Sequence, residues 1–161
     1  MVRSMKTIFS GLCIALFVCS TALFGQESEE VVIPTEISQP PYQVGNLISE
    51  QGYYIANGDG SSINFRIVDN KIRIYWLDVN KLIMEPAAAT ASVRFTGSVK
   101  GRSFHQAVSL QGDVGLGSPA IMPPPHIYNV ILALQDESGE TYTSHAFRYT
   151  PDMDVAKEVE P

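Results

Sequence analysis

The sequence has little cysteine, and what it has lies at the very start of the chain. The 161 residues contain two cysteines, Cys13 and Cys19. The residues after them can form no disulfide and offer no thiolate as a nucleophile or a metal ligand. Export would permit disulfides, but a domain of roughly 100 residues can be held by its apolar core alone.

Positive charge is also scarce. The chain has 11 lysines and arginines against 17 aspartates and glutamates, a net charge of −6 at pH 7. The excess acid is concentrated in residues 26–40 and 151–161, and the part between them is nearly neutral. No basic field exists that would bind nucleic acid or an anionic membrane surface. The sequence also lacks a convincing amphipathic helix, which leaves β-strands as the expected elements.

Residues 1–25 have the pattern of a cleavable signal peptide. Two basic residues precede an uncharged run over residues 7–26, and small residues near Gly25 suit a signal peptidase. We expect cleavage after Gly25, with the bond after Ala22 as second choice. An uncleaved membrane anchor and lipidation at Cys19 are the alternatives. Cleaved export to the periplasm or the cell exterior, leaving no membrane span, is the prediction.

Composition divides the rest of the chain into three parts. Residues 26–48 are acidic, contain prolines and show no sustained period, so they are predicted to be an exposed linker. Residues 49–150 are predicted to form one β-domain, and residues 151–161 a flexible acidic tail. The length suits one domain with a real core rather than two.

The clearest structural signal is a hairpin over residues 61–78. Apolar and polar residues alternate on both sides of Asp69 and Asn70, which tolerate the left-handed conformations of a tight turn. A two-residue turn there pairs Ile67 with Ile72, Phe65 with Ile74, Ile63 with Trp76 and, on the other face, Arg66 with Arg73. The pattern therefore predicts that Trp76 lies in the core.

The same period of two, interrupted by glycine, asparagine and proline turns, predicts seven strands. They are residues 51–56, 61–68, 72–78, 91–97, 103–110, 127–135 and 141–149. Seven short antiparallel strands are typical of a single immunoglobulin-like β-sandwich, which is the predicted all-β fold.

The run from Ile63 to Gly97, a strand, a turn, IRIYWLD and an alanine–threonine strand, resembles small secreted bacterial β-sandwich domains. Most of these are uncharacterised, and some are similar to periplasmic copper-resistance proteins. The likeness lies in the pattern of strands rather than in a chemical motif. It implies the sandwich fold and, as an alternative function, copper binding in the periplasm.

Three histidines, His105, His126 and His145, are the candidate metal ligands, with Met122 as a further donor. Imidazoles that converge in space form copper or zinc sites. No two of these histidines have the short spacing that places both ligands on one element. The prediction is therefore no metal and no cofactor.

Catalysis by a nucleophile requires a base within hydrogen-bond reach and a third group that orients the base. Serines, histidines and acids are present, but no recognised framework brings them together. We predict no catalytic residue. A hydrolase of undefined type is the weakest alternative.

The loop over residues 111–125 is the candidate interaction surface. Its end combines two apolar side chains with a run of prolines, namely Ile121, Met122, Pro123, Pro124 and Pro125. Prolines favour a stiff extended conformation, so less entropy is lost when the segment docks on a partner. The alternative is that the loop only plugs the open end of the domain.

Aromatic residues offer a further candidate. Tyr53, Tyr54, Tyr75 and Trp76 would suit a sugar or a peptide, but neighbours on a strand face opposite ways. Taken together, the sequence predicts an exported, non-catalytic β-sandwich module for binding or structural interaction with an envelope protein or ligand. Copper binding and hydrolysis are the alternatives.

Overall fold

The computed structural model describes residues 33–36, 38, 42–97, 103–110 and 114–155. The elements in this part of the chain are β1 (Tyr53–Ala56), β2 (Ser62–Val68), β3 (Lys71–Leu77), β4 (Ile83–Met84), β5 (Thr90–Gly97), β6 (Ser103–Leu110), β7 (Leu116–Gly117), β8 (Tyr128–Gln135), β9 (Thr141–Tyr149) and the short 3-10 helix η1 (Pro151–Met153). All pairings between these strands are antiparallel.

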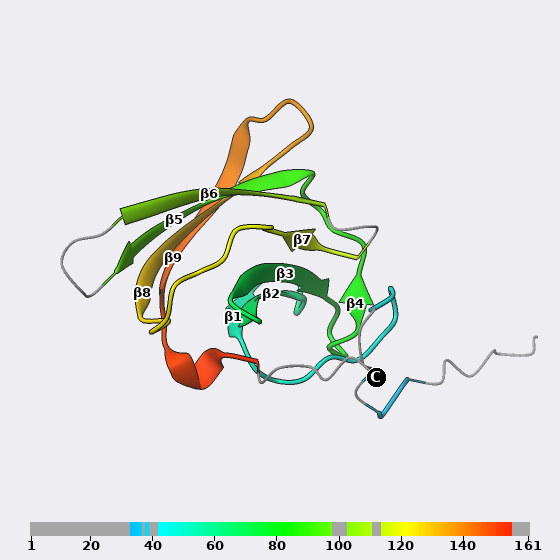
Figure 1. The fold of residues 1–161 in the computed structure, drawn as a ribbon. Coiled ribbons are helices and arrows are strands. Elements are labelled where there is room, and N and C mark those ends of the chain that lie inside the picture. The colour runs from blue at the N-terminus through cyan, green and yellow to red at the C-terminus, as the bar shows by residue number, and fades with distance from the viewer. Residues whose placement is uncertain (1–32, 37, 39–41, 98–102, 111–113, 156–161) are drawn as a thin grey trace, which may run out of the picture. The chain divides into compact units, whose positions relative to one another are not determined.

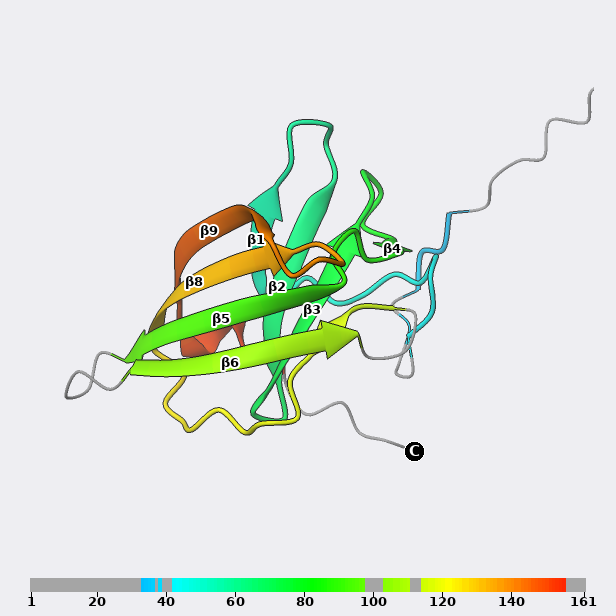
Figure 2. The same cartoon turned by 90° about the horizontal axis from the view of Figure 1, so that it is seen from above.

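The strands form one continuous sheet in the order β1-β2-β3-β7-β6-β5-β8-β9, with β4 paired to β3. The sheet curves back on itself, so that β1, β2 and β3 lie across from β5, β6, β8 and β9 (Figure 1). Seen from above, the two groups of strands run across one another (Figure 2). The short strand β7 joins them because it pairs with both β3 and β6. The fold is a nearly closed antiparallel barrel.

The predicted all-β antiparallel fold is confirmed, but the structure is not a clear immunoglobulin-like sandwich. A sandwich has two separate sheets, whereas β7 makes the sheet continuous here. All seven predicted strands occur, with ends displaced by no more than two residues. The strands without a predicted counterpart, β4 and β7, have two residues each, which is too short to show an alternating pattern.

The predicted register of the β2–β3 hairpin is confirmed. The pairs are Ile67 with Ile72, Phe65 with Ile74, Ile63 with Trp76 and Arg66 with Arg73. Asp69 and Asn70 form the turn with positive φ values of 49° and 61°. Trp76 is 6% exposed and belongs to the core inside the barrel.

Aromatic side chains connect the two halves of the barrel through its interior. The ring of Phe65, on β2, has its centroid 5.2 Å from that of Phe147 and 5.7 Å from that of Tyr149, both on β9. On the other side, Phe65 lies 6.3 Å from Phe95 on β5. The hairpin thus contributes the central side chain of the core.

The outer face of the hairpin is covered as well. Tyr42 and Ile48, from the segment predicted to be a linker, form a second core cluster with three residues of β3 and β4. Those residues are Tyr75, Leu77 and Ile83. Polar residues of β2 that alternate with the interior ones, including Arg66, are therefore buried rather than solvated. The described residues from 42 to 48 belong to the folded unit.

The two end strands of the sheet meet at a seam. Tyr53 of β1 and Phe147 of β9 stack with centroids 4.2 Å apart and planes 4° from parallel. Two backbone hydrogen bonds hold the segment after β9 against the hairpin side, from Gly52 N to Met153 O (3.0 Å) and from Val155 N to Ile67 O (3.2 Å). Residues 151–155, assigned to a flexible tail from the sequence, instead help to close the barrel. The predicted leader lies outside the described residues, among which no helix has the length and hydropathy to cross a bilayer.

Candidate functional site

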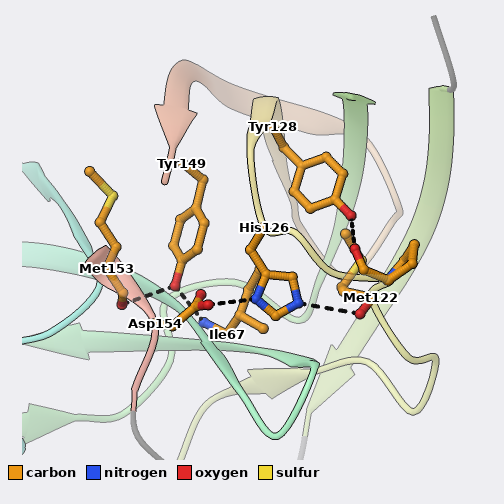
Figure 3. A network of polar contacts seen from close by, with 8 residues as sticks. Ile67, Met122, His126, Tyr128, Tyr149, Met153 and Asp154 are labelled. Atoms are coloured by element: carbon orange, nitrogen blue, oxygen red, sulfur yellow. Dashed lines mark hydrogen bonds and ion pairs between the residues drawn. The ribbon is translucent and has the colours of Figure 1, made fainter. Parts of the chain in front are cut away.

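The loop between β7 and β8 covers one end of the barrel and carries a buried histidine (Figure 3). His126 is 6% exposed. Its Nδ1 lies 2.7 Å from Oδ2 of Asp154, and its Nε2 lies 3.3 Å from the carbonyl oxygen of Met122. Because a carboxylate and a carbonyl both accept, both contacts are hydrogen bonds only when the ring carries a proton on each nitrogen. The pair, called here the His126–Asp154 clasp, ties the loop to the segment after β9.

Two tyrosine hydroxyls lie beside the clasp (Figure 3). The Tyr149 hydroxyl accepts from the N–H of Ile67 (3.0 Å) and donates to the carbonyl of Met153 (3.0 Å). Burial, reinforced by the Asp154 carboxylate, raises the pKa of Tyr149 although the Ile67 N–H acts in the other direction. The Tyr128 hydroxyl donates to the carbonyl of Pro123. Burial is the main cause that raises the pKa of Tyr128, and the negative charge of Asp154 adds to it.

Stability is expected to fall at alkaline pH because folded Tyr149 holds its proton more tightly than the unfolded chain does. Unfolded tyrosine ionises near pH 10, so above about pH 10 unfolding releases a proton. The free energy of unfolding therefore decreases as pH rises from there. Phenylalanine cannot ionise, so Tyr149→Phe should make this decrease less steep. The same variant lacks the two hydrogen bonds of the hydroxyl, so its free energy of unfolding at neutral pH should be lower by about 1–3 kcal/mol. Urea unfolding between about pH 8 and pH 11 measures both effects. Equal slopes for the two proteins would contradict the expectation.

The clasp resembles the histidine–carboxylate pairs of hydrolases but has a different second partner. In those enzymes the free ring nitrogen takes a proton from a nucleophile. Here Nε2 of His126 faces the carbonyl of Met122, which has no proton to give. The arrangement holds two segments of chain together, and it does not form a nucleophile–base pair.

The three histidines lie in different places. His105 is exposed on the outer face of β6, beside Arg94 of β5. His145 is partly buried on β9 in register with the core residue Leu132, so it belongs to the inner row of that strand. His126 is in the clasp, with both nitrogens engaged. Within the described ranges, no three His, Cys, Asp or Glu side chains gather closely enough to hold a metal ion.

Of the five residues in the predicted interaction surface, four are exposed and one is buried. Ile121 is 68% exposed, and Pro123, Pro124 and Pro125 are also exposed. Met122 is instead fully buried in the core, and its N–H donates to the carbonyl of Asn70 (2.6 Å). The prediction that Met122 is a surface residue is therefore wrong. Its side chain fills the end of the barrel, as expected if this part of the loop plugs the domain.

A groove that the sequence does not predict lies near β1 and the outer cluster. Its volume is about 780 Å³, and it is lined by residues 47–51 together with Thr35, Tyr54, Asn80 and Lys81. A second cavity of about 400 Å³ shares Glu50 and Gln51 with it and is completed by Gly52, Asp152 and Met153. Residues 50 and 51 therefore contact both spaces.

A buried arginine holds the segment that lines both cavities. Arg66 is fully buried, and its guanidinium lies 5.8 Å from the ring centroid of Tyr75. Its hydrogen bonds run from Nε to Asn64 Oδ1 (2.6 Å), from Nη1 to Ser49 Oγ (3.0 Å), and from Nη2 to Ser49 O (2.7 Å) and Gln51 O (3.0 Å). The groove wall at residues 49–51 is fixed by these contacts.

A lysine and a tyrosine face one another in the groove. Nζ of Lys81 lies 5.1 Å from the ring centroid of Tyr54 and 3.4 Å from Oγ of Ser62. Burial raises the pKa of Tyr54, and the Arg66 guanidinium, which also hydrogen-bonds to it, acts in the opposite direction. An ammonium group and an aromatic ring therefore lie together on this side of the groove.

Comparison with known proteins finds no family model, no curated protein and no solved structure that matches the chain. The resemblance to small secreted β-sandwich domains accordingly stays a prediction.

Proposed function

We propose that the protein is an exported, non-catalytic binding module and that the groove beside Tyr54 is its ligand site. The groove is the observation that carries this proposal. Its volume of about 780 Å³ lies within the usual range for small-molecule sites. Leu47 and Ile48 supply apolar contact, while hydroxyl, amide, carboxylate and ammonium groups line the remainder. Such a mixture provides both contact area and orientation for a ligand.

The groove also meets the requirement of rigidity. Arg66 fixes residues 49–51 through both side-chain and main-chain acceptors. A wall that is already ordered loses little conformational entropy when a ligand binds, which increases affinity. A flexible segment of the same composition would bind more weakly.

A non-catalytic role is supported by the clasp. Nδ1 of His126 faces the Asp154 carboxylate, Nε2 faces the carbonyl of Met122, and the residue is buried, so the ring is not presented to a substrate. The hydrolase alternative would require Nε2 to leave the carbonyl of Met122 and meet a nucleophile. Copper binding through the histidines would require them to converge, and they lie on β6, in the β7–β8 loop and on β9.

Export belongs to the same proposal and rests on the leader pattern of residues 1–25. The exported protein is expected to begin at Gln26. Its intact mass tests this, since a mass that retains the leader would indicate a membrane anchor instead.

Binding in the groove is tested by nuclear magnetic resonance with two chemically different probes, tri-alanine and maltotriose. At least one probe is expected to shift amide resonances of residues 47–51, Tyr54 and Lys81. Asn80→Trp, which places a large side chain in the groove, should remove those shifts while leaving the fold intact. Shifts that gather on residues 121–125 instead would transfer the binding role to that loop. No shift in either region would contradict the proposal.

A further inference from the structure

The groove holds one charge of each sign, whereas the charged side chains of the cavity beside it are both carboxylates. Lys81 lines only the larger space, Asp152 lines only the smaller one, and Glu50 lines both. A ligand that occupies both spaces therefore meets an ammonium group in one and carboxylates in the other. A purely anionic ligand would face Glu50, and a neutral one would leave these charges unused.

Two hydroxyls reinforce the cationic side. Oγ of Ser49 accepts a hydrogen bond from Nη1 of Arg66 at 3.0 Å, and the Tyr54 hydroxyl is also hydrogen-bonded to that guanidinium. A guanidinium has only donors, so each hydroxyl must direct its own proton elsewhere. Both residues line the groove, where these protons are available to an acceptor on a ligand. Together with the ammonium group of Lys81 they form a set of three donors.

We infer that the two cavities together bind a short peptide with free ends. Its carboxylate lies against the donors of Ser49, Tyr54 and Lys81, and its amino group lies against Glu50 and Asp152. Carboxylates accept charge-assisted hydrogen bonds, which are stronger than neutral ones, so the C-terminus is held at the cationic side. The opposite charges fix the direction in which the peptide lies. This inference rests on the proposed function of the groove.

The probes are tri-alanine, tri-alanine amide and N-acetyl-tri-alanine, each titrated into the protein by calorimetry and nuclear magnetic resonance. Tri-alanine is expected to bind at residues 47–52, Tyr54 and Lys81. Blocking either end removes one charged contact, so each blocked peptide should bind about tenfold more weakly.

Variants assign each end of the peptide to its cavity. Lys81→Met should weaken tri-alanine about tenfold and make it bind no better than its amide. Asp152→Asn should instead reduce the difference between tri-alanine and its N-acetyl form. Lys71→Met, at the turn of the hairpin, and Glu137→Gln, in the β8–β9 turn, change the same charges outside both cavities and should alter nothing.

The outcomes separate this inference from the proposed function. Equal affinity for the free and blocked peptides would overturn the free-ended peptide and leave the binding module in place. Groove resonances that shift with maltotriose but not with tri-alanine would likewise overturn the free-ended peptide and leave the binding module in place. If neither tri-alanine nor maltotriose shifts the groove resonances, both proposals fail.

Discussion

Replacing Trp76 with alanine is expected to lower the free energy of unfolding by about 3–5 kcal/mol. Trp76 lies on β3 between Ile63 of β2 and Met84 of β4, and its side chain is inside the barrel. The substitution removes the largest kind of side chain from a closely packed interior and leaves a cavity that the sheet cannot collapse to fill. Since the chain has one tryptophan, urea unfolding is followed by circular dichroism rather than by fluorescence.

Two further variants make the Trp76 result interpretable. Tyr142→Ala removes an aromatic ring that is exposed on β9, and should change stability by no more than about 0.5 kcal/mol. Trp76→Phe keeps most of the apolar volume and provides a folded protein to measure if the alanine variant does not fold. A loss below about 1 kcal/mol for Trp76→Ala would contradict the buried position.

Replacing Arg66 with methionine is expected to cost about 2–4 kcal/mol, since a buried acceptor left without a partner costs roughly 1–3 kcal/mol and hydrogen bonds to a charged group contribute more than neutral ones. The guanidinium donates to the buried Oδ1 of Asn64 and to the partly buried carbonyls of Ser49 and Gln51, and methionine cannot donate to any of them. The Gln51 carbonyl still accepts from Nδ2 of Asn64 (3.1 Å), so the loss is greatest at Asn64 and Ser49. The methionine side chain still fills much of the space, so the cost reflects the lost hydrogen bonds rather than a cavity. Urea unfolding measures the loss of stability.

Arg73→Met is the matched control, because Arg73 lies directly opposite Arg66 in the hairpin register. Arg73 is only partly buried, and its Nη1 donates to the adjacent carbonyl of Ile72. Its removal should cost less than about 1 kcal/mol. If both variants lose the same stability, the contacts of Arg66 with residues 49–51 do not carry the energy assigned to them.

Local signals were enough to predict the hairpin. The period of two and the Asp69–Asn70 turn fix the register within a few residues of sequence, so no information about distant segments was needed. The same holds for the bounds of the other long strands. Strand pairing across the barrel depends instead on β7, whose two residues leave no pattern, so the seven recognisable strands by their number predict a sandwich.

Burial on both faces of β2 could not be predicted from its alternation. Arg66 and Asn64 occupy positions that normally face solvent, and the cluster that includes Tyr42 and Ile48 covers this face of the hairpin. The composition of that segment predicts a linker, because its acidic and proline-rich beginning outweighs Tyr42 and Ile48. Contacts that join residues 17 positions apart, as between Ser49 and Arg66, leave no local signature.

The candidate site was missed for the same reason. The groove combines residues from Thr35 to Lys81, each ordinary in its own stretch of sequence. The sequence drew attention to histidines and to the proline loop, because those residue types carry recognisable chemistry. The alternation of β1 did predict that Tyr53 and Tyr54 face opposite ways, and the structure places Tyr53 at the seam and Tyr54 in the groove.

The seam between β1 and β9 also affects how the molecule avoids self-association. Both are end strands of one sheet, and an uncovered end strand offers unpaired backbone groups on which another chain can add a strand. The stacked rings of Tyr53 and Phe147 join the two end strands, and backbone hydrogen bonds hold Met153 and Val155 beside them, which obstructs strand addition at this end of the seam. A chain shortened before Pro151 would lose that protection, so its first symptom is aggregation through sheet edges rather than simple unfolding.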